Sequence, residues 1–262
     1  MKREMSVSGS FYPARAEELQ RYFEHFTKVY SEENISLYSS TCKSVIVPHA
    51  GYIYSGYTAN IAYKLLQQSV AKEFLIIGPS HKVAFNGVSV CKYESYKTPF
   101  EDIKRAESLY DDLLKNFRLT CREDAHFEHS TEVQFPFIKY YLPDVSIVEL
   151  VYSQIDSDFI SKIIDFVLSQ KDYGVIISTD LSHFYNLNDA NKLDNICLDA
   201  VEDLDVDKLN SGCEACGKTG IEAMMKTAKK LGLNSNILDY RTSADVSDDS
   251  SRVVGYMSAY FE

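Results

Sequence analysis

The chain alternates between short runs of consecutive apolar residues and longer segments in which apolar residues recur every three or four positions. The short runs predict buried strands at residues 43–48, 73–81, 86–93, 145–153, 173–180, 234–243 and 252–261. The periodic segments predict helices at residues 14–33, 57–68, 101–117, 156–170 and 213–232. Strands that are apolar at nearly every position are typical of a sheet covered on both faces. The pattern therefore predicts an α/β fold, with a central mixed sheet and helices on both faces.

This alternation continues along the whole chain without a repeat, a low-complexity tract or a Pro/Gly-rich linker. A chain of 262 residues is long enough for one large domain or two small ones. The unbroken pattern favours a single domain over residues 1–262. The content of 45% apolar and 25% charged residues is ordinary for a globular protein and does not change this prediction.

The net charge of −11 argues against a nucleic-acid partner, because binding to phosphates needs basic patches. The sequence has no run of roughly 18 apolar residues, which argues against a membrane partner. The opening residues, MKREMSVSGSFYPARAEE, lack the apolar core of a secretion signal. We therefore expect a cytoplasmic protein that binds a small molecule or a peptide.

The six cysteines are scattered, and in a reducing compartment we expect all of them to be thiols. Cys213 and Cys216 form a CxxC motif, but the second pair that a zinc ribbon needs is missing. We interpret them as two small residues near the start of a helix. A redox role for the motif is the alternative.

Titratable residues stand at the ends of four predicted strands. His49 follows the first strand, His81 ends the second, Asp180 and His183 end or follow the fifth, and Asp245 follows the sixth. Open α/β sheets bind ligands beyond the carboxyl ends of their strands, so we expect these side chains on one rim. A single histidine there is commonly a hydrogen-bonded loop residue. Three of them on one rim favour a binding site, because burying them together is costly unless they bind something.

Two or three histidines with one or two carboxylates form a ligand set that suits Fe(II), Zn or Cu. With coordination positions left open, such a site binds O₂ or activates water. The segment HFEHSTEVQFPF adds His129 and Glu132, which are three positions apart and so share a face if this segment is helical. We interpret His126 in the same segment as a loop residue. Tyr54, in the turn after His49, offers a hydroxylated aromatic wall for a phenolic or peptide ligand, and packing on the sheet is the alternative.

Six short motifs resemble those of the Memo family. They are GSFYPA (9–14), VPHAGYIYSG (47–56), GPSHK (78–82), EHSTEVQFPF (128–137), STDLSHF (178–184) and SRVVGYMSA (251–259). Each motif alone is a weak signal, but all six occur in order and cover almost the whole chain. The chain is therefore identified as a Memo-like domain over residues 1–262.

The resemblance implies a fold like that of class III extradiol dioxygenases of the LigB type, which hold Fe(II) with two histidines and a carboxylate. It implies that His49 and His81 are metal ligands, and that Asp180 and His183 are catalytic, with His183 at the position of the dioxygenase acid/base. We assign His129, Glu132 and Tyr54 to ligand binding. The implied cofactor is a divalent metal, with Fe(II) preferred and Cu or Zn as alternatives.

One departure from the family changes the expected ligand set. In animal members a cysteine before the last strand completes the metal site, and that position is occupied here by Val246. We therefore expect no thiolate ligand, which disfavours a soft Cu(I) site. Asp245, or otherwise Glu132, is expected to supply a carboxylate instead.

Three functions remain open from the sequence. The first is a metal-dependent oxidoreductase of the dioxygenase type, although fold alone does not establish that chemistry. The second is a non-catalytic protein that keeps the pocket and binds a peptide, a phosphotyrosine-type group or a small ligand. The third is a metal-assisted hydrolase. The resemblance also implies a functional link to radical-SAM and AMMECR-type proteins, which are often encoded beside prokaryotic members, whereas animal members are linked to cell motility and receptor phosphotyrosines.

Overall fold

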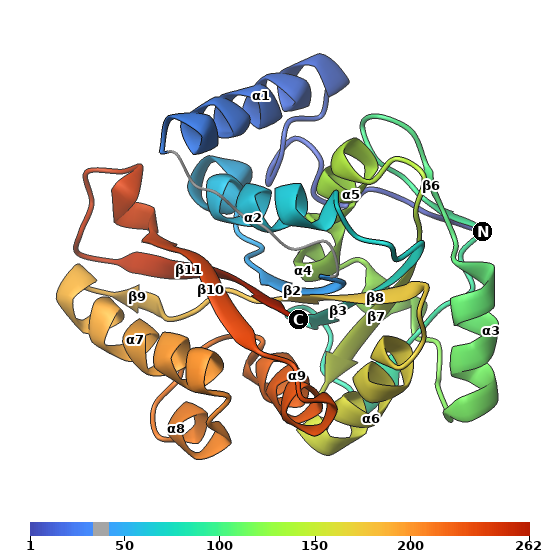
Figure 1. Ribbon diagram of the computed structural model, residues 1–262. Helices are drawn as coiled ribbons and strands as arrows, with labels where there is room; N and C mark the ends of the chain where they lie inside the picture. Colours follow the sequence, from blue (N-terminus) through green and yellow to red (C-terminus); the bar gives the residue numbers. More distant parts are fainter. Residues whose placement is uncertain (34–41) are drawn as a thin grey trace.

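The computed structural model describes residues 1–33 and 42–262, and its centre is a mixed β-sheet (Figure 1). The strands follow the order β10-β11-β2-β8-β3-β7-β4. Four neighbouring strands are parallel: β2 (Ser44–Val47), β8 (Tyr173–Ser178), β3 (Glu73–Pro79) and β7 (Ser146–Ser153). Antiparallel strands complete the sheet: β4 (Gly87–Ser89), β10 (Ser235–Thr242), β11 (Val253–Phe261) and the short β9 (His183–Tyr185), which pairs with β11.

Helices cover both faces of this sheet, as the apolar pattern predicts (Figure 1). One face packs against α1 (Ala16–Glu32), α2 (Tyr52–Leu66) and α5 (Phe135–Tyr141). The other face packs against α3 (Glu107–Asn116), α6 (Ser157–Leu168), α7 (Leu187–Asp203), α8 (Val206–Asn210) and α9 (Lys218–Leu231). Alternate residues of a strand point to opposite faces, so Phe74 and Ile76 of β3 belong to one core and Leu75 and Ile77 to the other.

The predicted helix at 14–33 is confirmed as α1, and its packing shows why this segment is helical. Leu19, Phe23 and Phe26 are spaced four and three positions apart, so they lie on one face of the helix and are buried. Burying each of these side chains contributes roughly 1.5–3 kcal/mol. The acidic residues Glu17 and Glu18 lie in the first turn, where their negative charges interact favourably with the helix dipole.

Three predicted helices begin elsewhere than expected. The helix expected from residue 57 begins at Tyr52, whose buried ring packs against the rings of Phe23 and Phe137. Residues 101–117 divide into β6 (Ile103–Lys104) and α3. The helix expected from residue 213 begins at Lys218, so the CxxC motif lies in the loop before it. Helix α7 was not predicted, because its buried side is made of Ala190, Asp194, Cys197, Ala200 and Val201, which are small or polar and give a weak apolar period.

A second, small sheet holds the N-terminus against the main body. Strand β1 (Lys2–Arg3) is parallel to β5 (Ser95–Tyr96), which is antiparallel to β6. This pairing carries Arg3 into the interior, where its side chain is 2% exposed. No helix in the described part of the chain is long and apolar enough to cross a membrane.

The expectation that all six cysteines are thiols is wrong for four of them. Disulfides join Cys91 to Cys121 and Cys197 to Cys213, with Cα–Cα distances of 4.7 and 4.9 Å. The partners are 30 and 16 residues apart in the sequence, so only the folded packing shows which cysteines meet. Cys216 is not part of a disulfide.

Candidate metal centre

The loops that follow β2, β8 and β3 meet at one rim of the sheet. Because β8 lies between β2 and β3, the residues after these strands are neighbours in space. The ring centroids of His49 and His81 are 5.2 Å apart, and each lies within 5.3 Å of the ring centroid of His129. The backbone N–H of His49 donates to Asp180 Oδ1 over 2.7 Å. The structure thus brings together four residues that the sequence assigned to a site.

The hydrogen bonds around His49 determine its tautomer. Its Nδ1 lies 3.1 Å from the Ser178 hydroxyl, which already donates its own proton to the carbonyl of Ser130. Gln134 Nε2 also donates to this hydroxyl oxygen, over 2.8 Å. The oxygen can therefore only accept from the imidazole, so Nδ1 carries the hydrogen and Nε2 keeps a free lone pair. Burial lowers the pKa of His49, and the neighbouring His81 and His129 lower it further, which keeps the ring neutral.

Glu128 orients the other two histidines. Its carboxylate is fully buried and lies 3.3 Å from His81 Nδ1 and 2.8 Å from His129 Nδ1. It also accepts backbone N–H bonds from His81 and His129. Burial alone would raise the pKa of Glu128, but the bonds from His129 and His81 outweigh it and hold that pKa far below its usual range. A carboxylate bound to Nδ1 leaves Nε2 of each ring as the ligand atom, which is the usual arrangement at histidine-bound metals.

A thiol completes the group. Cys216 Sγ lies 3.2 Å from His49 Nε2 and receives the backbone N–H of Asp180 over 3.3 Å. Burial raises the pKa of this thiol to about 12, and the charge of Asp180 adds to the effect. The loop that carries it approaches β8 closely, since a Cβ on Gly217 would stand 2.6 Å from the Thr179 side chain. Only glycine fits at that position, and this contact brings Cys216 to the rim.

Two sets of candidate ligands arise within the described residues. One is His49, His81 and Cys216, and the other is His81, Glu128 and His129; in each set the ligand atoms lie within 4.8 Å of one another. One of these sets includes a thiol, Cys216, which was not expected from the sequence. The thiol comes from the loop before α9, not from the segment before the last strand, where Val246 stands.

The structure does not bring Asp245 into this group. Asp245 lies in the 3-10 turn Ser243–Asp245, and its Oδ2 accepts the backbone N–H and the hydroxyl of Thr242 over 2.7 and 3.1 Å. This reciprocal cap shapes the turn after β10. The proposed carboxylate ligand is thus a local structural residue, which the spacing along the sequence could not distinguish from a ligand.

Glu132 is also held away from the rim, although it shares the helical turn α4 (His129–Glu132) with His129. Its fully buried carboxylate forms an ion pair with Arg3 over 3.1 Å. It also accepts hydrogen bonds of 2.8 Å from the backbone N–H groups of Ser6 and Val7, and one of 3.0 Å from the hydroxyl of Tyr12. These partners saturate both oxygens, so Glu132 fastens the N-terminal segment.

The two residues assigned to catalysis lie beside the histidines. Asp180 Oδ2 is 3.9 Å from His49 Nε2, and burial raises the pKa of Asp180. His183 is partly exposed at the start of β9, and its charge acts on the pKa values of both His49 and Asp180. Tyr54 is 43% exposed in the first turn of α2.

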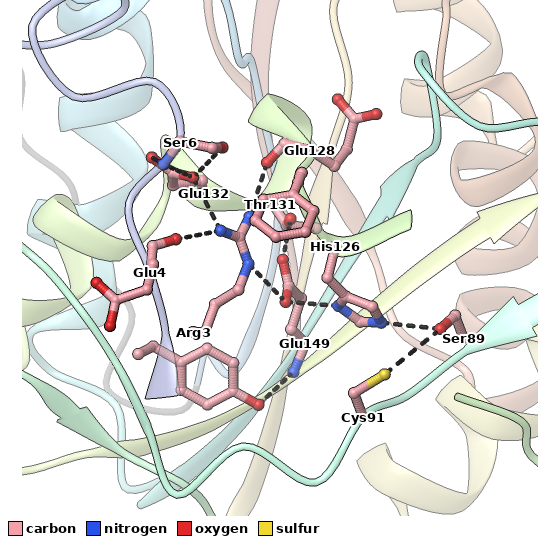
Figure 2. A network of polar contacts seen from close by, with 12 residues as sticks. Arg3, Glu4, Ser6, Ser89, Cys91, His126, Glu128, Thr131, Glu132 and Glu149 are labelled. Carbon is pink, nitrogen blue, oxygen red and sulfur yellow. Dashed lines mark hydrogen bonds and ion pairs between the residues drawn. The ribbon is translucent and has the colours of Figure 1, made fainter. Parts of the chain in front are cut away.

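A buried polar network supports the rim from below (Figure 2). Arg3 inserts between Glu132 and Glu149, and its Nη2 donates to the carbonyl of Glu128 over 3.1 Å. His126 Nδ1 lies 2.7 Å from Glu149 Oε2, and its Nε2 lies 2.8 Å from the Ser89 hydroxyl. His126 ends the short 3-10 turn Glu123–His126 and belongs to neither candidate ligand set, but its side chain is buried within this network, which its interpretation as a loop residue did not predict.

Two residues of the site were not assigned from the sequence, Cys216 and Glu128. A signal for Cys216 is the glycine directly after it in a loop that precedes a helix, since such a glycine marks a close backbone approach. Similarly, a Cβ on Gly78 at the end of β3 would stand 2.6 Å from Ser130 Oγ, which shows how closely α4 and Glu128 approach that strand. The sequence alone does not show which segment of the chain approaches either glycine.

Comparison with known proteins identifies the family of the chain. A family model described as Memo-like protein matches residues 3–260. The chain is 34% identical to a MEMO1 family protein of Thermoplasma acidophilum, over 98% of each chain. It is 33% identical to one of Aquifex aeolicus, over 99% of this chain and 98% of the relative, and 36% identical to one of Methanobrevibacter smithii over the full length of both. The chain therefore belongs to the Memo-like protein family.

Proposed function

We propose that this protein binds a first-row transition-metal ion through His49, His81 and Cys216. The observation that carries the proposal is the His49 tautomer: Ser178 and Gln134 leave the lone pair of Nε2 3.2 Å from Cys216 Sγ. His81 completes the set, with its Nδ1 bound to Glu128. The His81 side chain is 31% exposed, so an ion can enter from solvent.

The donor set favours particular ions. Two neutral imidazoles and a cysteine sulfur, which gives up its proton when it binds a metal, suit Fe(II), Zn or Cu and disfavour Mg²⁺ and Ca²⁺, which prefer oxygen ligands. The sulfur of Cys216 is a soft donor that was not expected from the sequence, so this donor set no longer disfavours Cu(I). Three protein ligands leave coordination positions open, and a bound ion there supplies Lewis acidity and, for iron or copper, one-electron chemistry with O₂.

The residues around the ligands are suited to proton transfer. Asp180 is buried with a raised pKa, so this carboxyl holds a proton more readily than an exposed one. His183 is partly exposed, so its imidazole can be reached from solvent. We propose that His183 moves a proton to or from a bound substrate and that Asp180 orients His49 through its backbone N–H. The LigB-type fold that the resemblance to the Memo family implies would support an oxidoreductase of this kind.

A direct test is metal analysis of protein purified under argon, followed by calorimetric titration with Fe(II), Zn(II) and Cu(I). We expect about one ion per chain, and loss of binding in His49→Ala and Cys216→Ser. The matched control is His25→Ala, which removes an exposed histidine on α1 that lies outside both ligand sets. Equal affinity in wild type and His49→Ala would overturn the proposed centre.

Oxygen consumption then separates catalysis from binding. Iron-loaded protein should consume O₂ with a catechol-type substrate, and His183→Ala should slow the reaction more than it weakens metal binding. Tight metal binding with no turnover would instead favour a protein that keeps the site for ligand recognition.

A further inference from the structure

A second candidate site lies away from the metal ligands. A pocket of about 490 Å³ opens between α1, α2 and the turn that follows β10. Its walls are mainly aromatic and aliphatic, and the apolar residues that line it are Tyr22, Phe26, Val29, Ile53, Tyr54, Tyr57 and Val246. Three of these side chains are unusually accessible for their type: Ile53 is 61%, Tyr54 43% and Val246 54% exposed. A pocket of this volume matches a small organic ligand rather than a macromolecular surface.

The charged side chains that line this pocket differ in whether they already have partners within the protein. The Arg241 guanidinium stacks 4.2 Å from the centre of the Tyr57 ring and pairs with Glu33 and Asp239. Its charge is therefore already balanced. The carboxylate of Asp245 accepts the two hydrogen bonds from Thr242 that cap the turn.

Arg21 differs from these groups. It lines this pocket and the adjoining one, and its guanidinium makes no hydrogen bond or ion pair with any residue of 1–33 or 42–262. Glu18, whose pKa is lowered in part by the charge of Arg21, is already paired with Arg15. An unpaired guanidinium at the edge of an aromatic pocket presents a fork of donors that matches a carboxylate.

We propose that this pocket binds a small aromatic carboxylate, with the ring between Tyr22, Tyr54 and Ile53 and the carboxylate on Arg21. The aromatic walls favour a flat apolar ring, and Arg21 supplies the charge that selects an acid over its neutral analogue. The pocket next to it, which shares Arg21 and Tyr54, continues along Phe11. The Phe11 ring lies 4.7 Å from the ring of His129, so the proposed site borders the metal centre without using its ligands.

The test uses 3-(4-hydroxyphenyl)propionate as the probe and its uncharged amide as the matched ligand. Binding to the full chain is measured by calorimetry and by ligand-observed NMR. We expect the acid to bind at least about five-fold more tightly than the amide, as a charge-assisted contact implies. Arg21→Gln should remove this preference. Ile53→Asp should weaken binding of the acid further, because it places a second negative charge in the wall of the pocket. Arg118→Gln, which changes an exposed arginine beyond α3, should leave the preference unchanged.

The same measurements separate this inference from the proposed metal centre. His49→Ala should lose the metal and keep the preference for the acid. Loss of acid binding in His49→Ala, with binding intact in Arg21→Gln, would place the acid at the metal centre and overturn the inference. Equal affinity for acid and amide in wild type would overturn it as well, whatever the metal result.

Discussion

At the scale of single residues, the candidate centre depends on groups that do not themselves touch a ligand. The Ser178 hydroxyl is bound by a donor, Gln134, and by an acceptor, the carbonyl of Ser130, so its remaining lone pair is directed to His49. This single contact decides which imidazole nitrogen is available to a metal. The same logic applies to Glu128, which holds His81 and His129 by Nδ1.

We predict that Ser178→Ala weakens metal binding by about 10- to 100-fold, because the partner that orients a ligating histidine is lost. The variant also leaves a donor of Gln134 without this acceptor, so unfolding should be measured beside the calorimetric titration. Ser258→Ala is the matched control. Ser258 is buried in β11, and its hydroxyl has no hydrogen-bond partner among the described residues. If both variants lose affinity equally, the hydrogen bond to His49 is not the cause.

At the scale of elements, β1 acts as a strap whose last residue, Arg3, pairs with two buried carboxylates. Arg3 lies 3.1 Å from Glu132 and 3.4 Å from Glu149, and all three side chains are almost fully buried. Burial alone would raise the pKa of Glu149, but Arg3 and then His126 hold it below its usual value. The strap also reaches the carbonyl of Glu128, so it supports the helical turn that presents His129.

Arg3→Met should therefore destabilise the protein by about 3–5 kcal/mol at pH 7, since it removes the guanidinium that pairs with two buried carboxylates. In the wild type, a folded pKa of Glu149 below its ordinary 4.5 contributes stability that is present above pH 4.5 and is lost as pH falls through the folded value. The variant loses this contribution, so the difference between the two proteins should shrink below pH 4.5.

Urea unfolding at several pH values measures this difference. Lys2→Met is the control, because the neighbouring Lys2 forms an exposed pair with Asp102, and it should change stability little at any pH. A difference between wild type and Arg3→Met that stays constant from pH 7 to below pH 4.5 would contradict the assigned role of Arg3.

At the scale of the whole molecule, the strands and the polar residues at their ends could be predicted from the sequence, but the order of the strands in the sheet could not. Runs such as SVIV and EFLIIGP predict β2 and β3 because they are rich in apolar residues, and the structure buries every position in them except the first residue of β3. Nothing local shows that β8 pairs between them. Cys216 is 167 positions from His49, and Glu128 is 47 positions from His81, so both belong to the site only through the sheet order and the helix packing. Asp245 shows the converse, because a local cap uses the side chain that the sequence placed at the metal.

The two disulfides also belong to this scale, because each ties distant elements together. Cys197 of α7 is bonded to Cys213, in the loop that also carries Cys216 to the rim. A cross-link over 16 residues stabilises a fold by about 3 kcal/mol in the loop-entropy account. We predict that replacing Cys197 and Cys213 by serine lowers the melting temperature and weakens metal binding several-fold, because the loop of Cys216 gains freedom. Replacing Cys91 and Cys121 should lower the melting temperature without affecting the metal.

Alkylation of the denatured protein followed by mass spectrometry checks the pairing on which this prediction rests. The sequence has six cysteines, and the two that lie outside both disulfides are Cys42 and Cys216. Unreduced chain should therefore take up two alkyl groups, and reduced chain six. Uptake of six groups without a reductant would show that the thiols are not paired, and equal metal affinity in both double variants would show that the Cys197–Cys213 bond does not position Cys216.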